Sequence, residues 1–319
     1  MSKKMFLAHI LDISGLINLK LLLKRKNHLL ILTYHRILSK PHDFAFDEGV
    51  ISVSPDIFEE EVKFCKTYFS LINFEQLKNA LEGITILPPN PLIITFDDGY
   101  RDNYVHAFPI LKKYNAPATI FIAVDYIGKD KIFWWDEVSF YMKKSGHDQK
   151  GEIDNMLRSL KLVSNRERIQ RIEELNNRAN IDISNLKMDR QILNWEEVKE
   201  MSTGGIEFGS HTMTHPLLSQ LDDMSEVAYE LVKSKEILEN KTNKRAIAFS
   251  YPVGKRNAFN EHIKENVKKT GYDFAVTYMH GVNYLDDRID RYALKRMDLD
   301  QQDLPMFKAK LAYPEIFKR

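Results

Sequence analysis

Residues 91–99 read Pro-Leu-Ile-Ile-Thr-Phe-Asp-Asp-Gly, an apolar run that ends in two adjacent carboxylates. A short continuous apolar run of this kind is typical of a buried parallel strand. Asp97 and Asp98 would then leave the strand at its carboxyl end, where active sites of α/β proteins lie. Two adjacent acids repel each other, and a cation bound to one of them would hold both ionised near neutral pH. An Asp-Asp-Gly taken alone is more often a turn.

Apolar runs and helical patterns alternate along most of the chain. Residues 54–69 predict a helix that Ser54 caps and in which Pro55 takes the first position. Repeated strand and helix units with short turns indicate a parallel sheet, either open or closed as a barrel. We predict further strands at 29–34, 118–123, 206–208, 246–249 and 274–277, and further helices at 103–114, from 223 onward and at 260–270.

Residues 126–194 do not keep this alternation. They contain Trp134-Trp135-Asp136 and then a long stretch rich in Arg, Glu, Lys and Asn with spaced Leu and Ile. This pattern predicts a helical insertion between two strands, with most of its charges on a solvated helix face.

The composition is that of an enzyme-sized globular protein. The 319 residues are 44% hydrophobic and 29% charged, and the formal net charge is +1, so no overall field favours nucleic acid as a partner. Cys65 is the only cysteine and sits in an amphipathic pattern, where a lone thiol is usually a small core residue. An intrachain disulfide is impossible, which favours a reducing compartment.

Residues 1–28 form an N-terminal amphipathic segment. Polar residues interrupt its apolar run, whereas a secretory core or a spanning helix needs a cleaner one. The segment could pack on the body of the protein, or it could lie on an anionic membrane surface through nearby basic residues. We therefore expect a cytoplasmic enzyme, with peripheral contact to the inner face of the membrane as the alternative to simple packing. The basic residues are Lys20, Lys24, Arg25 and Lys26.

A second group of chemically useful residues follows the predicted strand at 206–208. His211 and His215 stand four residues apart, and Pro216 disfavours a helical conformation at His215, so the pair predicts a ligand loop. A lone histidine is more often structural. Two imidazoles and one carboxylate make a three-ligand open site suited to Zn²⁺ or another divalent metal, and the same set also fits non-haem iron.

These motifs together resemble the polysaccharide deacetylase family, which includes chitin, peptidoglycan and chitooligosaccharide deacetylases. The similar segments are Leu32-Thr-Tyr-His-Arg-Ile37, Thr95-Phe-Asp-Asp-Gly99, His211-Thr-Met-Thr-His215 and Tyr251-Pro-Val-Gly254, in this order. The resemblance implies a distorted (β/α)₇ barrel over residues 29–319, with 126–194 inserted in it. Trp134-Trp135-Asp136 and Leu193-Asn-Trp195 are also similar to a branch of the family from bacterial exopolysaccharide clusters.

The resemblance also implies roles for individual residues. Asp98, His211 and His215 would bind the metal, most simply Zn²⁺ with Co²⁺ or Ni²⁺ as alternatives, and Asp97 would be the general base. A backbone N–H near Val253 would meet the oxyanion, and Pro252 and Gly254 would shape that loop. Substrate-binding candidates are His35, Trp135, Tyr251, Pro252, Val253 and Gly254.

Two features depart from the family pattern. Ser250 stands where the family usually has an Arg that orients the base, and Lys255 or Arg256 would have to reach back to replace it. The Leu-x-His motif that supplies the general acid has no clear match. His280 is the catalytic candidate for this role and His35 is a second one.

The expected activity is metal-dependent hydrolysis of the N-acetyl group from an amino sugar in a polysaccharide, an oligosaccharide or a lipid-linked precursor. One alternative is a deformylase or another amidohydrolase acting on a lipid-linked amino sugar with the same site. A second alternative is a catalytically weak sugar-binding protein that keeps the barrel but lacks the acid and the orienting Arg.

Overall fold

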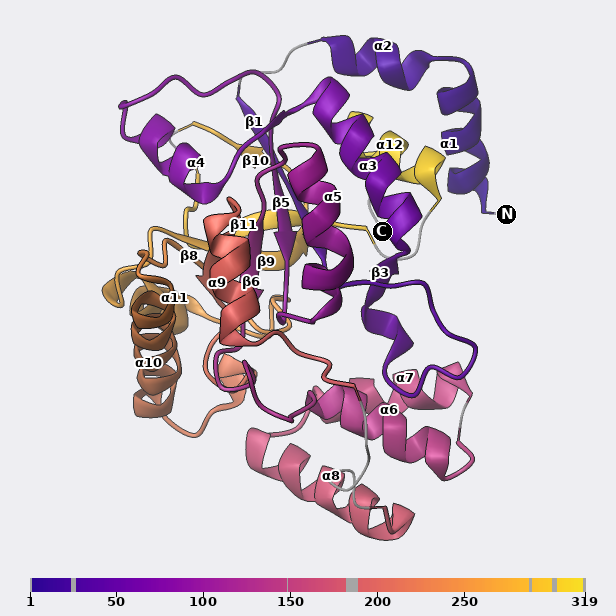
Figure 1. The fold of residues 1–319 in the computed structure, drawn as a ribbon, viewed down its shortest axis with the longest axis vertical. Helices are drawn as coiled ribbons and strands as arrows, with labels where there is room; N and C mark the ends of the chain where they lie inside the picture. The colour runs from indigo at the N-terminus through magenta and orange to yellow at the C-terminus, as the bar shows by residue number, and fades with distance from the viewer. Residues whose placement is uncertain are drawn as a thin grey trace.

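Seven parallel strands close into a barrel within the residues that the computed structural model describes, 2–23, 27–147, 149–181, 189–286, 289–299 and 303–317. The strands β1 and β5 pair with each other, and β1 also pairs with β11, which closes the ring. Helices surround it (Figure 1). The predicted (β/α)₇ barrel is therefore confirmed. Its strands are β1 (His28–Tyr34), β5 (Pro91–Phe96), β6 (Thr119–Ile122), β7 (Glu207–Ser210), β8 (Ala248–Ser250), β9 (Phe274–His280) and β11 (Leu294–Asp298).

Apolar side chains fill the amino-terminal half of the barrel interior. Alternate residues of a strand face the same side, so the inward positions of β5 are Ile93, Thr95 and Asp97. Ile93 joins a buried cluster inside the ring, and α4 (Phe74–Leu81) closes the amino-terminal mouth, with the ring of Phe74 6.0 Å from that of Phe121. The polar residues therefore collect at the other, carboxyl end of the barrel.

Several outer helices begin at side-chain caps, and the cap of α3 is the one that the sequence predicts. Ser54 accepts a hydrogen bond from the N–H of Ile57 and starts α3, with Pro55 in the first position. Asp223 and Asn260 cap α10 and α11 in the same way. The helices of this layer are α3 (Pro55–Tyr68), α5 (Phe108–Lys113) after the π-helix η2 (Asn103–Ala107), α9 (Trp195–Thr203), α10 (Met224–Thr242), α11 (Glu261–Lys269) and α12 (Leu304–Ala312).

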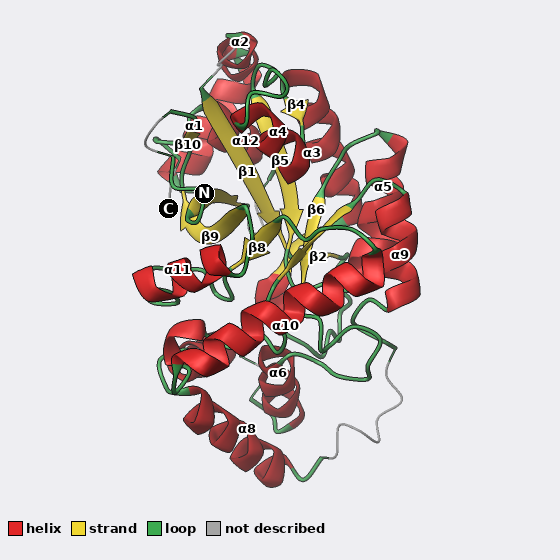
Figure 2. Ribbon diagram, turned by 90° about the vertical axis from the view of Figure 1, so that its left-hand side faces the viewer, coloured by secondary structure: helices red, strands yellow, loops and turns green. Residues whose placement is uncertain are grey.

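The region predicted as a helical insertion contains α6 (Trp134–Lys144), α7 (Lys150–Leu160) and α8 (Asn165–Ala179). In both ribbon views α6 and α8 lie together at one end of the molecule, opposite α2 (Figures 1 and 2). Short elements complete the structure: β2 (Arg36–Ile37), η1 (Glu48–Val50), β3 (Ile51–Val53), β4 (Ser70–Leu71), η4 (Leu218–Gln220) and β10 (Asn283–Tyr284).

The N-terminal segment forms α1 (Lys3–Ile13) and α2 (Leu16–Leu22), which pack against α12. Among the described residues no single helix is long and apolar enough to cross a membrane; α1 and α2 pass that test only as a pair, bent by 72°. The predicted basic residues Lys24, Arg25 and Lys26 lie outside the described residues.

Glu61 of α3 is a buried acid far from any predicted site residue in the sequence. Its side chain is fully buried and accepts a hydrogen bond of 2.8 Å from the hydroxyl of Tyr34. Burial raises the pKa of Glu61 to about 8, although the Tyr34 hydroxyl and the Lys310 ammonium oppose the shift. The carboxyl group is therefore protonated in the folded protein at neutral pH.

This raised pKa predicts that stability falls as pH rises. An unfolded glutamate has a pKa of about 4.3, so the folded state binds the proton more tightly than the unfolded state does. The stabilisation that this gives is complete below about pH 4.3 and is lost as the pH rises to about 8. We expect the free energy of unfolding, measured by urea titration, to fall by on the order of 2 kcal/mol between about pH 6 and about pH 8. Glu61→Gln should abolish most of this decline, whereas the exposed Glu60→Gln should leave it intact.

Candidate metal centre

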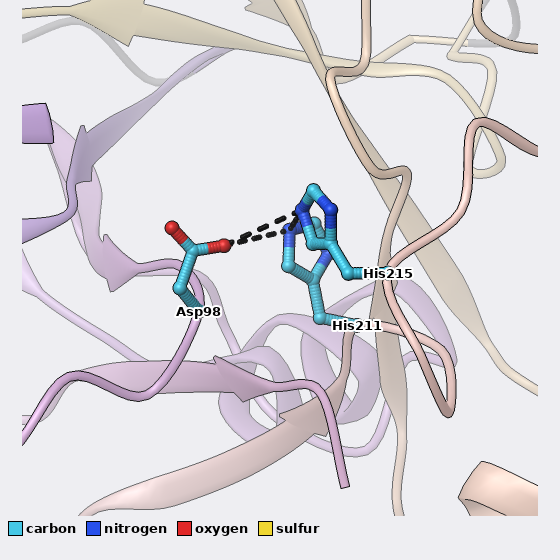
Figure 3. A group of neighbouring side chains, drawn as sticks. All are labelled: Asp98, His211 and His215. Atoms are coloured by element: carbon cyan, nitrogen blue, oxygen red, sulfur yellow. Dashed lines mark hydrogen bonds and ion pairs between the residues drawn. The ribbon is translucent and has the colours of Figure 1, made fainter. Parts of the chain in front are cut away.

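Three side chains from two strand ends converge at the carboxyl end of the barrel. Asp98 follows β5, His211 follows β7, and His215 stands four residues later (Figure 3). The Oδ1 atom of Asp98 lies 3.5 Å from Nε2 of His211 and 3.4 Å from Nε2 of His215. The two Nε2 atoms are 3.1 Å apart. One atom from each residue can therefore approach a common ion.

The backbone bends sharply to present these ligands. Asp98 has a φ of 75°, Thr212 of 68° and His215 of 58°, all in the left-handed region that residues other than glycine rarely adopt. The four Asn residues with positive φ outside the site, by contrast, belong to a type that tolerates this conformation. Such strain persists only where the surroundings enforce it, and it concentrates at functional sites.

Hydrogen bonds fix the histidine loop from both sides. Nδ1 of His211 donates to the carbonyl of Ser250 at 2.7 Å, which leaves its Nε2 as a free lone pair. Glu230 accepts from the N–H groups of Met213 and Thr214 and from the Thr214 hydroxyl. The loop between the two ligands is therefore held by a carboxylate of α10.

At Gly209, two residues before His211, β7 packs too closely against its neighbours to leave room for a side chain. A Cβ atom at Gly209 would lie 2.5 Å from the ring of Phe121 and 2.7 Å from the carbonyl oxygen of Ala248. Since real Cβ atoms do not approach so closely, a side chain at this position would displace the strand that carries the ligand.

The three residues fit a divalent metal. All are buried, and the ion pairs of Asp98 among the described residues are with the two histidines, so no Lys or Arg neutralises this carboxylate. Within the described residues, Nδ1 of His215 is also buried and has no hydrogen-bond partner. Burial and the neighbouring His211 lower the pKa of His215 to about 3, so its imidazole is neutral, as a ligand must be. Two imidazoles and one carboxylate are a usual zinc set with an open position.

Asp97 is held by an arginine that the sequence analysis did not identify. Arg296 of β11 donates from Nη1 to Oδ1 at 2.8 Å and from Nη2 to Oδ2 at 2.6 Å, and both side chains are buried. Burial alone would raise the pKa of Asp97, but Arg296 and His211 outweigh it and hold that pKa well below its usual range. Asp97 is therefore a fully ionised, rigidly oriented carboxylate.

Arg296 takes the place that the family pattern gives to an Arg at position 250. Its Nη2 atom lies 3.2 Å from Oγ of Ser250, so the guanidinium fills the space beside the shorter side chain. The hypothesis that Lys255 or Arg256 reaches back is wrong, because both are exposed and Arg296 occupies both oxygens of Asp97. The sequence offers no local signal for this role, because Arg296 lies 199 positions from Asp97 in a five-residue strand with a loop-like composition.

The loop at residues 251–254 forms a strained turn. The N–H of Gly254 donates to the carbonyl of Pro252 at 2.7 Å, and Val253 between them has a φ of 63°, which is rare for a β-branched residue. The N–H of Val253 has no hydrogen-bond partner within the described residues. Tyr251 is buried, stacks on Phe259 and donates its hydroxyl to the carbonyl of Tyr292. Its predicted contact with substrate stays a prediction.

The two candidate acids occupy different surroundings. His35 follows β1, is partly exposed, and lies near enough to Asp97 and Asp98 to help lower the pKa of both carboxyls. His280 pairs with Arg296 at the end of β9, and its charged neighbours are Lys310, Asp298 and Glu315. Burial lowers the pKa of His280. Among the described residues His280 makes no hydrogen bond or ion pair with the ligands or with Asp97.

Trp135 packs beside a ligand. Its ring centroid is 4.6 Å from that of His215, and its Nε1 donates to the hydroxyl of Tyr100 at 2.8 Å. That hydroxyl donates to Asp136, whose other oxygen accepts from the N–H of Asp47. Trp135 is 6% exposed, so the structure shows it supporting His215, and its predicted sugar contact stays a prediction.

The comparisons with known proteins agree with this geometry. The polysaccharide deacetylase family model matches residues 86–275, which is more than half of the chain. The chain belongs to the polysaccharide deacetylase family. The match contains all three metal-ligand candidates and Asp97, but neither His35 nor Arg296.

Two relatives show the extent of the similarity in sequence. The Bacillus subtilis protein YxkH, named as a polysaccharide deacetylase, is 30% identical over 206 residues, 65% of this chain and 50% of the relative. A Staphylococcus aureus poly-β-1,6-N-acetyl-D-glucosamine N-deacetylase is 32% identical over 125 residues, 36% of this chain and 42% of the relative. The chain thus spans half or less of the length of these relatives.

Two solved structures share the fold of this deacetylase-family chain. The Streptococcus pyogenes deacetylase PplD has a TM-score of 0.63 and 21% identity, covering 91% of this chain and all of that one. IcaB from Ammonifex degensii has a TM-score of 0.62 and 18% identity, covering 90% and 97%. These likenesses confirm the barrel.

The buried pair of Arg296 and Asp97 predicts a strong energetic coupling. Arg296→Met removes one partner and leaves a buried carboxylate alone, which should lower the free energy of unfolding by about 3–5 kcal/mol. Adding Asp97→Asn should restore much of that loss, because no unpaired charge then remains. Urea titrations of the two single variants and the double variant measure the coupling. A coupling near zero would show that the pair does not hold the site together.

The ligand geometry predicts one tight divalent metal per chain. Calorimetric titration of metal-free protein with Zn²⁺ should give one site, and Asp98→Ala or His211→Ala should weaken it by at least about tenfold. His262→Ala, which removes an exposed imidazole on α11, is the matched control and should change nothing. Retained affinity in both ligand variants would show that the ion binds elsewhere.

Proposed function

We propose that this chain is a metal-dependent hydrolase that removes N-acetyl groups from amino sugars in a polysaccharide, an oligosaccharide or a lipid-linked sugar precursor. The observation that carries the proposal is the convergence of Asp98, His211 and His215 beside a carboxylate that Arg296 orients. Membership of the deacetylase family supports it, as does similarity to a relative named as a poly-β-1,6-N-acetyl-D-glucosamine N-deacetylase.

Zn²⁺ is the metal we propose, with Co²⁺ or Ni²⁺ as substitutes, because imidazole and carboxylate ligands suit these ions. When bound, such a metal supplies a Lewis acid that lowers the pKa of a water toward about 7 and polarises the acetamide carbonyl. Asp98, His211 and His215 would hold it, and the second-sphere contact of His211 with Ser250 keeps that imidazole in the right tautomer.

Asp97 is the proposed general base. Its two oxygens accept one hydrogen bond each from Arg296, and every carboxylate oxygen keeps a second lone pair for an incoming proton. The guanidinium also fixes the plane of the carboxylate, which holds the remaining lone pairs in a constant direction. The N–H of Val253 is the proposed donor to the developing oxyanion, because the strained turn leaves it without another partner.

His35 is the proposed general acid in place of His280. It follows β1 at the same end of the barrel as the ligands, and it lies near enough to both carboxyls to help lower their pKa. Its ring is partly exposed and 5.9 Å from that of Tyr278, so it lies where solvent and substrate can reach. Comparing kcat for His35→Gln and His280→Gln tests the choice, and a larger loss in the His280 variant would reverse it.

Arg296 weakens the case for the alternative of a catalytically weak sugar-binding protein. That alternative rested partly on the missing Arg, and Arg296 supplies a guanidinium to the base. The deformylase alternative uses the same groups and differs only in the size of the acyl group.

The location of the enzyme stays a prediction. We propose that it acts in the cytoplasm at the inner face of the membrane, and the support for a membrane contact comes from α1 and α2, which turn many apolar side chains outward.

The proposed reaction is tested by acetate release from N-acetylglucosamine oligomers in the presence of Zn²⁺ or Co²⁺. We expect release by the wild type, a loss on treatment with a chelator, and recovery on adding metal. Asp97→Asn should reduce kcat by about 10²- to 10⁴-fold, because positioned proton transfer contributes that much. Asp222→Asn makes the same chemical change at an exposed position and should leave the rate unchanged.

Each other outcome points to a different function. Faster release of formate from N-formylglucosamine oligomers than of acetate from the acetylated ones would favour the deformylase. Binding of the oligomers with no release of either acid would favour the sugar-binding protein.

A further inference from the structure

The helix α1 turns much of its apolar surface outward. On α1 the outward side chains include Phe6, Leu7, Ile10 and Ile13, and all four are exposed. A helix on the surface of a soluble protein normally turns its apolar stripe inward and its charges toward water. The arrangement of α1 is therefore unfavourable in water alone.

The inward face of α1 is mixed: Ala8 is fully buried, Leu11 packs against the core, and polar side chains make specific contacts to α12 and its cap. Nε2 of His9 lies 2.7 Å from a carboxylate oxygen of Asp303, and Lys308 lies 3.1 Å from Asp12. The hydroxyl of Tyr313 donates to the carbonyl of Leu16 at the start of α2. These pairs hold the helix in its orientation, so the outward apolar face is fixed by the fold.

The second helix extends the apolar face. On α2, Ile17 and Leu21 pack inward, while Leu16, Leu19 and Leu22 point outward, followed by Leu23. Of the 18 exposed large apolar side chains in the described residues, eight lie between Phe6 and Leu23. We call these eight side chains the N-terminal apolar face. Such a concentration marks an interaction surface rather than ordinary scatter.

The charged residues of α1 and α2 themselves are almost all positive. Residues 2–23 contain Lys3, Lys4 and Lys20, and their one acid, Asp12, is turned inward and paired with Lys308. An apolar face bordered by lysines and free of outward carboxylates complements a bilayer with anionic headgroups. A second copy of this chain would bring the same positive charges to the contact, which disfavours self-association.

The N-terminal apolar face lies at the end of the barrel opposite the metal centre. α2 leads to the amino end of β1, and Asn90, which precedes β5, donates to the carbonyl of Leu21. The three ligand candidates follow the carboxyl ends of β5 and β7. A membrane bound at α1 and α2 would therefore leave the metal centre facing the aqueous side.

We propose that α1 and α2 form a peripheral docking surface for an anionic lipid bilayer. The apolar side chains enter the boundary between headgroups and acyl chains, and the lysines contact the headgroups. Neither helix needs to leave α12, because its apolar face is already outward. The inference is independent of the proposed deacetylation.

The proposal is tested by flotation of the full chain with vesicles of phosphatidylcholine, with and without phosphatidylglycerol. The wild type should float with the mixed vesicles and only weakly with phosphatidylcholine alone. Ile13 and Leu19 are 87% and 61% exposed, so the double variant Ile13→Glu/Leu19→Glu should fold normally. It should bind at least about tenfold more weakly, since two large side chains can no longer enter the apolar layer. Thermal melting followed by circular dichroism checks its fold.

Ile169→Glu is the matched control, because Ile169 is 51% exposed on α8 at the other end of the molecule. It should float as the wild type does. Equal flotation of the double variant and the wild type would overturn the proposal, as would a wild type that binds neither vesicle. Equal binding to both vesicle types would overturn the anionic assignment. A dimer that the double variant abolishes, without vesicle binding, would show that the face joins two copies of the chain.

Discussion

The site depends on the bidentate contact between Arg296 and Asp97 inside the barrel. Two adjacent buried carboxylates would otherwise repel each other and become protonated, since burial raises the pKa of each. The guanidinium neutralises Asp97, which leaves Asp98 as the charge that the histidines and a metal must balance. The pair thus separates the roles of two residues that are neighbours in the sequence.

Backbone strain also helps to give Asp97 and Asp98 different roles, because it turns their side chains in different directions. Asp97 keeps the inward direction set by the alternation of β5, whereas Asp98 leaves it through a left-handed φ of 75°. The same conformation recurs at His215 and Val253, so three loops at one end of the barrel are held in unfavourable geometry. The closed ring of strands and the buried apolar cluster around Phe74 supply the rigidity that this strain requires.

Much of the fold and the central ligands could be predicted from the sequence, because both depend on local patterns. Apolar runs predicted β1, β5 and β6, and the cap at Ser54 predicted α3. The motif spacing predicted that Asp98, His211 and His215 would come together. The strand β11 was missed because its five residues include Lys295, Arg296 and Asp298, a composition that resembles a loop.

Other features depend on contacts between distant residues and leave no local signal. Arg296 meets Asp97 across 199 positions of sequence, and this contact exists only once the first and last strands have paired. The outward apolar face of α1 is similar, because the sequence shows an amphipathic helix but not which face α12 will take. The roles of Trp135 and Tyr251 also depended on burial, which an aromatic residue in a motif does not reveal.

Arg296 comes after all three ligand candidates in the sequence, and this order has a consequence for synthesis. A ribosome delivers β5 and β7, with the three ligand candidates, well before β11 has emerged. A partly made chain therefore has the two carboxylates and the two imidazoles but lacks the guanidinium of Arg296, which orients Asp97. The candidate site can therefore take its final arrangement only after β11 has closed the barrel.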